Sequence, residues 1–414
     1  MINGEIVENR RKIANEFNNY FLSIAAKLNS SENMSESGLL IQTLPTFTNY
    51  LNTPISSSIF FNNCTPMEIQ EIITDFSSAK ASDIPVRILK ACSGIIAHIL
   101  CKYYNWFIEQ SIFPDIFKLA QVTPLFKKGE SQLFENYRPI SLLPIFGKIF
   151  EKIIFSRLHN FLSANNVISN QQFGFRKNHS TTHAINYSIS MILNGIENNK
   201  HVIGIFLDLS KAFDTINHDI MLAKLTNYGI RDNCLKLLES YLTSRKQIVK
   251  FGDELSDSGN IKYGVPQGSV LGPLLFLLYI NDIVNCTKIC KFVLFADDTN
   301  IFVVANTEHE AYQIANEALE KLQNYMVNNQ LHINLSKCTY IHFRPNLNNE
   351  DRKVCARSYT YLSHMENNIF IRGVKIKKVD KVRFLGVIID EKLTWDAHIE
   401  YLESKLLSAI TMIK

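Results

Sequence analysis

Two apolar runs separated by a pair of acidic residues restrict the fold of this chain more than any other feature. The runs are KFVLFA (291–296) and NIFVVA (300–305), and Asp297 and Asp298 lie between them. Short runs rich in β-branched and aromatic residues are typical of buried strands, and the tight spacing indicates a hairpin. A third run of the same kind is VIGIFLDL (202–209). The sequence therefore predicts a buried sheet.

Carboxylates are expected at the ends of these strands, because Asp208 ends the third run. Burying a carboxylate is costly unless a cation compensates its charge, and Mg²⁺ prefers carboxylate oxygens and its own waters. Two such ions about 3.5–4 Å apart would activate an attacking hydroxyl and stabilise a leaving pyrophosphate. The alternative is that the Asp-Asp pair only marks a turn and Asp208 only caps a helix.

The remaining pattern predicts a helical front followed by the order β-α-β-β-α-β. Thr65, Pro66 and Glu68 predict a capping box, and Thr307 with Glu310 predicts another. Residues 29–58 have the composition of a linker. Helices are expected at 10–28, from 66, at 85–110, 145–162, 181–198, 211–229 (ending at Gly229), 269–283 and 307–328, with further strands at 118–126, 333–343 and 381–390. This order predicts an α+β fold with helices on one face of the sheet.

Composition narrows the class of protein. Of 414 residues, 46% are hydrophobic, which supplies a large core and excludes a disordered or collagen-like chain. A net charge of +4 permits a nucleic-acid partner without arguing for one. Eight dispersed cysteines, none in a C-x-x-C pair, predict reduced thiols in an intracellular protein with no disulfide-linked partner. No apolar run approaches the roughly 18 residues of a membrane span, so no membrane partner is expected.

Six segments resemble, in order and spacing, successive motifs of reverse transcriptases. They read NYRPISLLP (136–144), QFGFRKNHST (172–181), FLDLSKAFD (206–214), GVPQGSVLGPLLF (264–276), FADDT (295–299) and RFLGVIID (383–390). The first two look like the fingers segments of non-LTR, LINE-type retrotransposon enzymes, most like the jockey-like group. The resemblance covers roughly residues 65–395. Its specificity comes from six ordered matches, since FADD alone would mean little.

The resemblance implies a right-hand polymerase fold of the α+β class, with reverse-transcriptase fingers, a palm built on a ferredoxin-like sheet, and a largely missing thumb. The implied regions are an N-terminal helix and linker (1–64), fingers (65–200), a palm with a fingers-proximal hairpin (201–343), the palm end with the primer grip (344–395) and the start of a truncated thumb (396–414). We expect no endonuclease, because the first region is too short.

The resemblance also implies roles at the acidic site. Asp208, Asp297 and Asp298 match aspartates that bind two Mg²⁺ ions, for which Mn²⁺ substitutes, and the backbone carbonyl of Leu209 joins them. Phe213 matches the steric gate, an aromatic side chain that excludes the 2′-hydroxyl of a ribonucleotide. The alternative for Phe213 is a core residue on the first turn of a helix.

Other motif residues are implied to contact the deoxynucleoside triphosphate (dNTP). Gln267 would lie near the incoming nucleotide and the template base, and Lys127 and Arg138 near the phosphates. The alternative for Lys127 is a solvated loop tip. Lys337 matches a lysine proposed to protonate the departing pyrophosphate, with an ordinary surface lysine as its alternative. The implied primer grip comprises Phe384, Leu385 and Gly386.

The implied activity is that of an RNA-directed DNA polymerase of a non-LTR retrotransposon. It would add dNTPs to the 3′-hydroxyl of a DNA primer on an RNA template, and would act in the nucleus although no targeting signal is evident. One alternative is a catalytically impaired relic or a domesticated nucleic-acid-binding protein with the same fold. A second alternative is an RNA-dependent RNA polymerase. Phe213 argues against it, because an RNA polymerase needs room for the 2′-hydroxyl.

Overall fold

A computed structural model of the chain describes residues 9–32, 47–77, 83–344 and 367–413. The chain forms two compact units. Each is built from separate stretches of sequence. Unit 1 comprises residues 1–168, 211–282 and 329–331, and unit 2 comprises residues 169–210, 283–328 and 332–414.

Unit 2 is organised around a five-stranded sheet with the strand order β12-β9-β3-β8-β7. The strands are β3 (His201–Leu207), β7 (Lys291–Phe295), β8 (Asp298–Ala305), β9 (Thr339–Phe343) and β12 (Lys377–Lys378). β3 pairs antiparallel with both β8 and β9, and β7 and β8 form the predicted hairpin. The four longer strands are β3, β7, β8 and β9 in chain order. In the sheet they lie in the order β9, β3, β8, β7, that is, fourth, first, third, second. This is the ferredoxin-like order that the resemblance implies.

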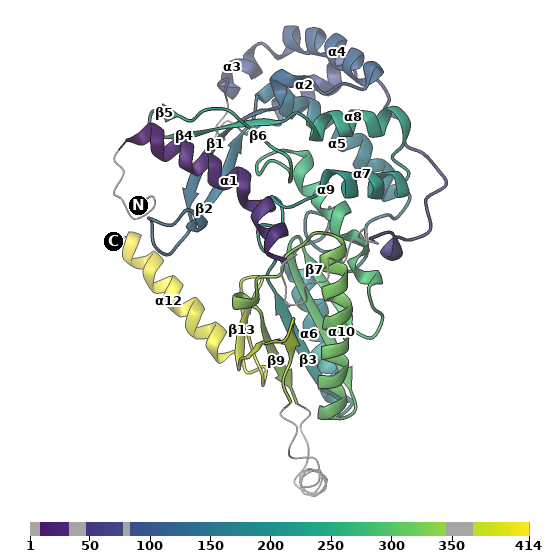
Figure 1. Cartoon of the computed structure of the whole chain (residues 1–414), viewed down its shortest axis with the longest axis vertical. Helices are drawn as coiled ribbons and strands as arrows, with labels where there is room; N and C mark the ends of the chain where they lie inside the picture. The colour runs from purple at the N-terminus through teal and green to yellow at the C-terminus, as the bar shows by residue number, and fades with distance from the viewer. Residues whose placement is uncertain (1–8, 33–46, 78–82, 345–366, 414) are drawn as a thin grey trace, which may run out of the picture. The chain divides into compact units, whose positions relative to one another are not determined.

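The expectation of helices on one face of this sheet was wrong. The helices in the described part of unit 2 are α6 (Thr181–Glu197), α10 (Glu308–Asn328) and α12 (Asp396–Ile413). A Cβ atom on Gly195 of α6 would lie 2.3 Å from Val202 of β3, so α6 packs closely on that face. Tyr312 of α10 contacts the ring of Tyr340, which pairs with Ile205. Val202 and Ile205 point to opposite faces of the pleated strand, so α10 covers the other face (Figure 1).

Two hairpins flank β12 in the chain, one before it and one after it. They are β10 (Phe370–Ile371) with β11 (Val374–Lys375), and β13 (Lys381–Phe384) with β14 (Val387–Asp390). The region 381–390, expected as a strand, is therefore two short strands joined by the two-residue turn Leu385-Gly386. Both turn residues have positive φ angles, 47° and 94°, as a tight hairpin turn requires.

Unit 1 combines helices with a five-stranded sheet in which β1 pairs antiparallel with β2 and parallel with β4. Its strands are β1 (Leu119–Phe126), β2 (Tyr137–Leu142), β4 (Lys246–Phe251), β5 (Glu254–Leu255) and β6 (Gly259–Asn260). Its helices are α1 (Arg10–Glu32), α2 (Pro66–Thr74), α3 (Val86–Ala91), α4 (Ser93–Gln110), α5 (Ile145–Ala164), α7 (His218–Asn227), α8 (Asp232–Leu242) and α9 (Leu271–Ile280). Phe17 and Phe21 of α1 share a buried cluster with Val122 of β1 and Val249 of β4, which fixes α1 on the sheet.

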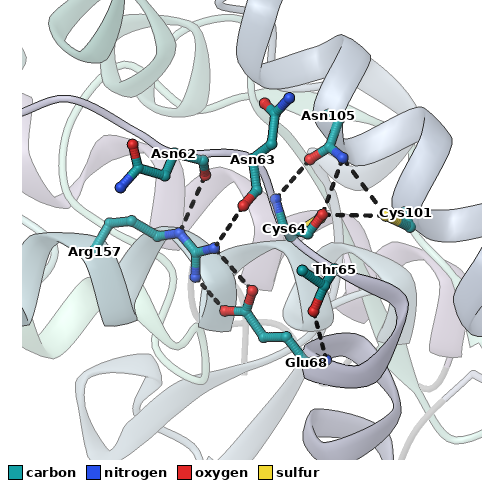
Figure 2. Close-up of polar contacts among 8 residues, drawn as sticks. All are labelled: Asn62, Asn63, Cys64, Thr65, Glu68, Cys101, Asn105 and Arg157. Carbon is teal, nitrogen blue, oxygen red and sulfur yellow. Dashed lines mark hydrogen bonds and ion pairs between the residues drawn. The ribbon is translucent and has the colours of Figure 1, made fainter.

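The N-terminus of α2 is held by side chains from other segments (Figure 2). The Thr65 hydroxyl accepts a hydrogen bond from the Glu68 N–H at 3.2 Å, as predicted. The expected second half of the capping box is replaced, because the Glu68 carboxylate binds both terminal nitrogens of Arg157 from α5. Arg157 also donates to the carbonyls of Asn62 and Asn63. One bidentate ion pair thus joins α2, α5 and the segment before α2.

Several predicted helix boundaries need correction. The helix expected over 85–110 is two helices that meet at Cys92. The helix expected from Lys211 begins at His218, where the Asn217 side chain accepts from two backbone N–H groups. The segment before it is a turn, so Phe213 does not lie on the first turn of a helix. Gly229 has a φ of 86° just after α7, as predicted for a left-handed helix end.

The linker prediction is only partly covered, since residues 33–46 lie outside the described residues, while 29–32 continue α1 and 47–50 form a 3₁₀ turn. Seven of the eight cysteines are described, and each is a thiol and not part of a disulfide. Cys355 lies outside the described residues. Within the described parts, no helix has the length and apolar character needed to cross a membrane.

Candidate active site

The strand register of unit 2 brings the three predicted aspartates to one end of the sheet. Leu207 at the end of β3 pairs with Thr299 of β8. Asp208 follows Leu207 and Asp298 precedes Thr299, so these two aspartates are neighbours across the two strands. Asp297 lies beside them, because it belongs to the two-residue turn between β7 and β8. The sequence prediction of carboxylates at strand ends is therefore confirmed.

Lys337 lies against the first of these carboxylates. Its Nζ atom is 2.6 Å from Oδ2 of Asp208, and both side chains are partly exposed, at 47% and 38%. The backbone sets this contact: the Asn334 N–H donates to the Asp208 carbonyl at 2.8 Å, and the Ser210 N–H donates to the His332 carbonyl at 2.7 Å. Residues 332–334 thus run alongside residues 208–210, which follow β3. This pairing brings Lys337 to the end of the sheet that carries the aspartates.

The donor chemistry of this end suits a hard divalent cation, because it offers carboxylate oxygens from three residues. In the described residues, however, no three acidic, histidine or cysteine side chains are gathered closely enough to hold a metal ion. Asp208 is instead neutralised by Lys337. The backbone therefore places the predicted ligands at one edge, and binding a cation there requires their side chains to close around it.

The turn that carries Asp297 is held by a segment that our sequence reasoning did not connect with it. The side-chain oxygen of Gln172 accepts hydrogen bonds from the backbone N–H groups of Gly174 (2.8 Å) and Ala296 (3.0 Å). The backbone of Phe173 donates to Leu294 at 2.8 Å. These contacts attach the QFGF segment to the edge of β7. The sequence shows a glutamine two residues before a glycine, but nothing in it indicates the partner of the glutamine.

Gly174 is a glycine because the backbone of the turn lies against it. A Cβ atom at Gly174 would lie 2.3 Å from the backbone nitrogen of Ala296. Ala296 itself has a φ of 56°, which is uncommon for a residue with a side chain. Arg176, the residue after the QFGF segment, donates from Nη1 to the carbonyls of Ser169 (2.9 Å) and Gln172 (3.0 Å). In this structure it supports the same segment.

In unit 1, the turn that contains Phe213 is joined to the GVPQG loop. The Val265 N–H donates to the Phe213 carbonyl at 2.9 Å, and the Gly264 N–H donates to the Ile216 carbonyl at 2.8 Å. The Phe213 ring stacks on Phe276 of α9, with the ring centroids 4.7 Å apart. Phe213 is only partly buried, so the stack fixes the ring without enclosing it.

Gln267 is fixed on the same loop by contacts at both its backbone and its side chain. Its carbonyl accepts from the Ser141 N–H of β2 at 2.8 Å. Its Nε2 atom donates to both carboxylate oxygens of Asp214, at 2.8 and 3.0 Å. Loss of water contact raises the pKa of Asp214 to about 6, although the hydrogen bond from Gln267 and the charge of Lys211 act in the opposite direction. Asp214 was not singled out from the sequence, although it ends the FLDLSKAFD motif.

Lys127 and Arg138 lie on the hairpin of β1 and β2. Arg138 pairs with Leu125, and the Lys127 N–H donates to the Asn136 carbonyl at 2.9 Å. Lys127 directly follows β1, so both cations lie near the turn end of this hairpin. Both are exposed. The hairpin therefore presents two positive charges together, as anion binding requires.

The predicted primer-grip residues form the tip of the β13–β14 hairpin in unit 2. Phe384 is 3% exposed, and its ring lies 5.6 Å from the ring of Phe206 in β3. Leu385 and Gly386 make the turn. The hairpin is thus anchored to the sheet through Phe384.

Enzymes that transfer phosphoryl and nucleotidyl groups use clustered carboxylates of this kind to hold divalent cations. Residues 126–389 match the family described as reverse transcriptase (RNA-dependent DNA polymerase). The chain belongs to this family, which implies the polymerase fold and a general dependence on divalent metal.

Curated relatives point to mobile elements. The chain is 28% identical over 349 residues to a protein named probable RNA-directed DNA polymerase from transposon X-element, of Drosophila melanogaster, covering 82% of this chain and 37% of the relative. It is 27% identical over 361 residues to the RNA-directed DNA polymerase from mobile element jockey of the same species, covering 84% and 38%. A polyprotein from the type-1 retrotransposable element R1 of Bradysia coprophila is 27% identical, covering 79% and 31%. The chain thus spans well under half the length of these relatives.

Proposed function

We propose that the chain is the RNA-directed DNA polymerase of a non-LTR retrotransposon and that it acts in the nucleus. It adds dNTPs to the 3′-hydroxyl of a DNA primer on an RNA template. The observation that carries this proposal is the register of β3, β7 and β8, which brings Asp208, Asp297 and Asp298 to one sheet end beside Lys337. The names of the relatives support the same activity.

The proposed regions follow the polymerase fold. Residues 65–200 form the fingers, 201–343 the palm, 344–395 the palm end with the primer grip, and the helix from Asp396 begins the thumb. The ferredoxin-like order of the unit 2 sheet supports the palm assignment. The pair of cations on the β1–β2 hairpin supports the fingers assignment.

Asp208, Asp297 and Asp298, with the carbonyl of Leu209, would hold two Mg²⁺ ions, or Mn²⁺ in their place. When bound, these ions supply positive charge that activates the primer hydroxyl and stabilises the departing pyrophosphate. Lys337 pairs with Oδ2 of Asp208, and its ammonium would donate a proton to the departing pyrophosphate.

The other residues would bind the nucleotide and the primer. Arg138 offers a planar fork of donors to phosphate oxygens and Lys127 offers a point charge. Gln267 presents its side chain to the incoming nucleotide. The β13–β14 hairpin holds the primer end through its tip, which Phe384 anchors to the sheet.

Primer extension tests the proposed function. The purified chain is expected to extend a DNA primer on an RNA template with dNTPs and Mg²⁺. A chelator should abolish synthesis, and excess Mg²⁺ or Mn²⁺ should restore it. If template and primer bind but no extension occurs in either metal, the result contradicts the proposal and favours a relic that keeps only nucleic-acid binding.

Phe213→Ala tests the steric gate. Removing the ring leaves space for a 2′-hydroxyl, so ribonucleotides are expected to be used at least about tenfold more efficiently relative to dNTPs, a change of about 1.4 kcal/mol in discrimination. The measurement is the ratio of kcat/KM for dTTP and UTP on the same template. Phe276→Leu is the matched control: it keeps an apolar support behind Phe213 and should change the ratio far less. An unchanged ratio in Phe213→Ala would show that Phe213 is only a packing residue.

A further inference from the structure

The pair formed by Gln267 and Asp214 has a defined polarity. A carboxylate only accepts hydrogen bonds, whereas an amide side chain has a donating end and an accepting end. Both oxygens of Asp214 lie within 3.0 Å of Nε2 of Gln267. An ionised Asp214 therefore captures the NH₂ end of the amide and leaves the carbonyl end directed elsewhere.

Packing alone does not fix this orientation. Asp214 and Gln267 line a cavity of about 50 Å³, together with Phe21 and Leu22 of α1 and Pro266. That space admits ordered water. It also leaves the surroundings of the two side chains loose enough for an amide to turn. The hydrogen bond to Asp214 is what selects one orientation.

We propose that Asp214 is a positioning residue: it orients the Gln267 amide so that its oxygen, and not its NH₂ group, is presented to a bound dNTP. This inference rests on the proposed function. It adds that the GVPQG loop offers the nucleotide a hydrogen-bond acceptor, and that the acceptor depends on the charge of a residue that does not itself touch the substrate.

The proposal predicts that the affinity for dNTP depends on pH through the charge of Asp214. The charged and titratable groups that face it are Lys211 on its own turn, Tyr20 on α1 and Lys262, which lines the same cavity. His218 binds the Gly264 carbonyl at 2.8 Å, and burial lowers its pKa. Once protonated, Asp214 can donate to the amide oxygen, so the amide gains a second orientation. Affinity for dNTP should therefore fall as the pH drops through about 6.

The experiment measures KM and kcat for dTTP on a poly(rA)–oligo(dT) template. Asp214→Asn removes the charge and keeps the shape, so either orientation of Gln267 becomes possible. Losing a hydrogen bond that involves an ionised group is expected to raise KM about tenfold, with little change in kcat. The wild-type KM should also rise at acid pH, and this rise should be absent in Asp214→Asn. Asp219→Asn, on the exposed first turn of α7, is the control that should match wild type.

A paired exchange separates orientation from a merely structural role. Gln267→Glu alone places two carboxylates together and should raise KM further. Combining it with Asp214→Asn lets the new amide donate to the new carboxylate, which again presents an oxygen, so KM should partly recover. Recovery supports the proposal, and a double variant no better than Gln267→Glu overturns it. This comparison and the pH profile of the wild-type chain test whether Asp214 orients the Gln267 amide, even if Asp214→Asn folds poorly.

The outcome also distinguishes this inference from the proposed function. If the wild-type chain extends the primer and Asp214→Asn has the same KM and pH profile, the inference is overturned and the proposed function stands. If the wild-type chain does not extend, the proposed function is contradicted, and stabilisation of the chain by dTTP in thermal melting becomes the readout. Stabilisation that is weaker in Asp214→Asn supports the positioning role, and stabilisation that is equal or missing overturns it.

Discussion

Replacing Asp297 with asparagine is expected to reduce primer extension by about a thousandfold without unfolding the chain. The amide keeps the size of the side chain but loses the negative charge that a divalent cation needs. Asp297 is in a two-residue turn and is only partly buried. A substitution at such a position typically changes the free energy of unfolding by less than about 0.5 kcal/mol.

The measurement is the single-turnover rate of nucleotide addition at saturating Mg²⁺, with thermal melting as the test of folding. Asp253→Asn is the matched control, because Asp253 occupies the same second position of a two-residue turn between β4 and β5. Its side chain is 97% exposed, and we assign it no role in catalysis. The control should retain full activity. Wild-type rates in Asp297→Asn would refute the proposed metal site.

The sheet of unit 2 could be predicted because three of its strands contain continuous apolar runs, VIGIFL, FVLF and IFVV, with aspartates close to one end. VIGIFLDL and the two runs around the Asp-Asp pair allow few other structures, and the structure pairs them in register. The apolar character of these strands also explains why the expectation of helices on one face was wrong. A strand that is apolar at every position has no polar face, so it is covered on both faces, and we expected helices on only one.

The supporting contacts could not be predicted, because they join residues far apart in the sequence. Nothing near Glu68 indicates that Arg157 will take its carboxylate in place of the Thr65 backbone. Likewise Lys337 could be matched to a motif, but its 2.6 Å contact with Asp208 depends on pairing between residues 208–210 and 332–334. Local periodicity carries no information on such pairs.

Gly174→Ala is expected to reduce the rate of nucleotide addition about a hundredfold, because a displacement of about 1 Å at a reacting group has costs of that order. The added methyl group would lie 2.3 Å from the backbone nitrogen of Ala296, and backbone cannot move aside as the end of a side chain can. Either the QFGF segment or the Asp297 turn must shift. The hydrogen bonds of Gln172 to Gly174 and Ala296 would be disturbed at the same time.

Gly94→Ala is the control for the chemical change itself. Gly94 lies in α4, and a Cβ atom there meets nothing within 4 Å. Alanine in a helix is expected to stabilise the chain by about 0.5–1 kcal/mol and leave the rate unchanged.

The Gly174→Ala variant itself is also expected to be less stable. Overpacking by the added methyl group should lower the free energy of unfolding by about 1–3 kcal/mol. Template–primer affinity, measured by anisotropy at fixed salt, should stay near wild type, because the Asp297 turn supplies no positive charge for the phosphate backbone. A rate near wild type in a folded Gly174→Ala chain would mean that the QFGF segment does not position the Asp297 turn.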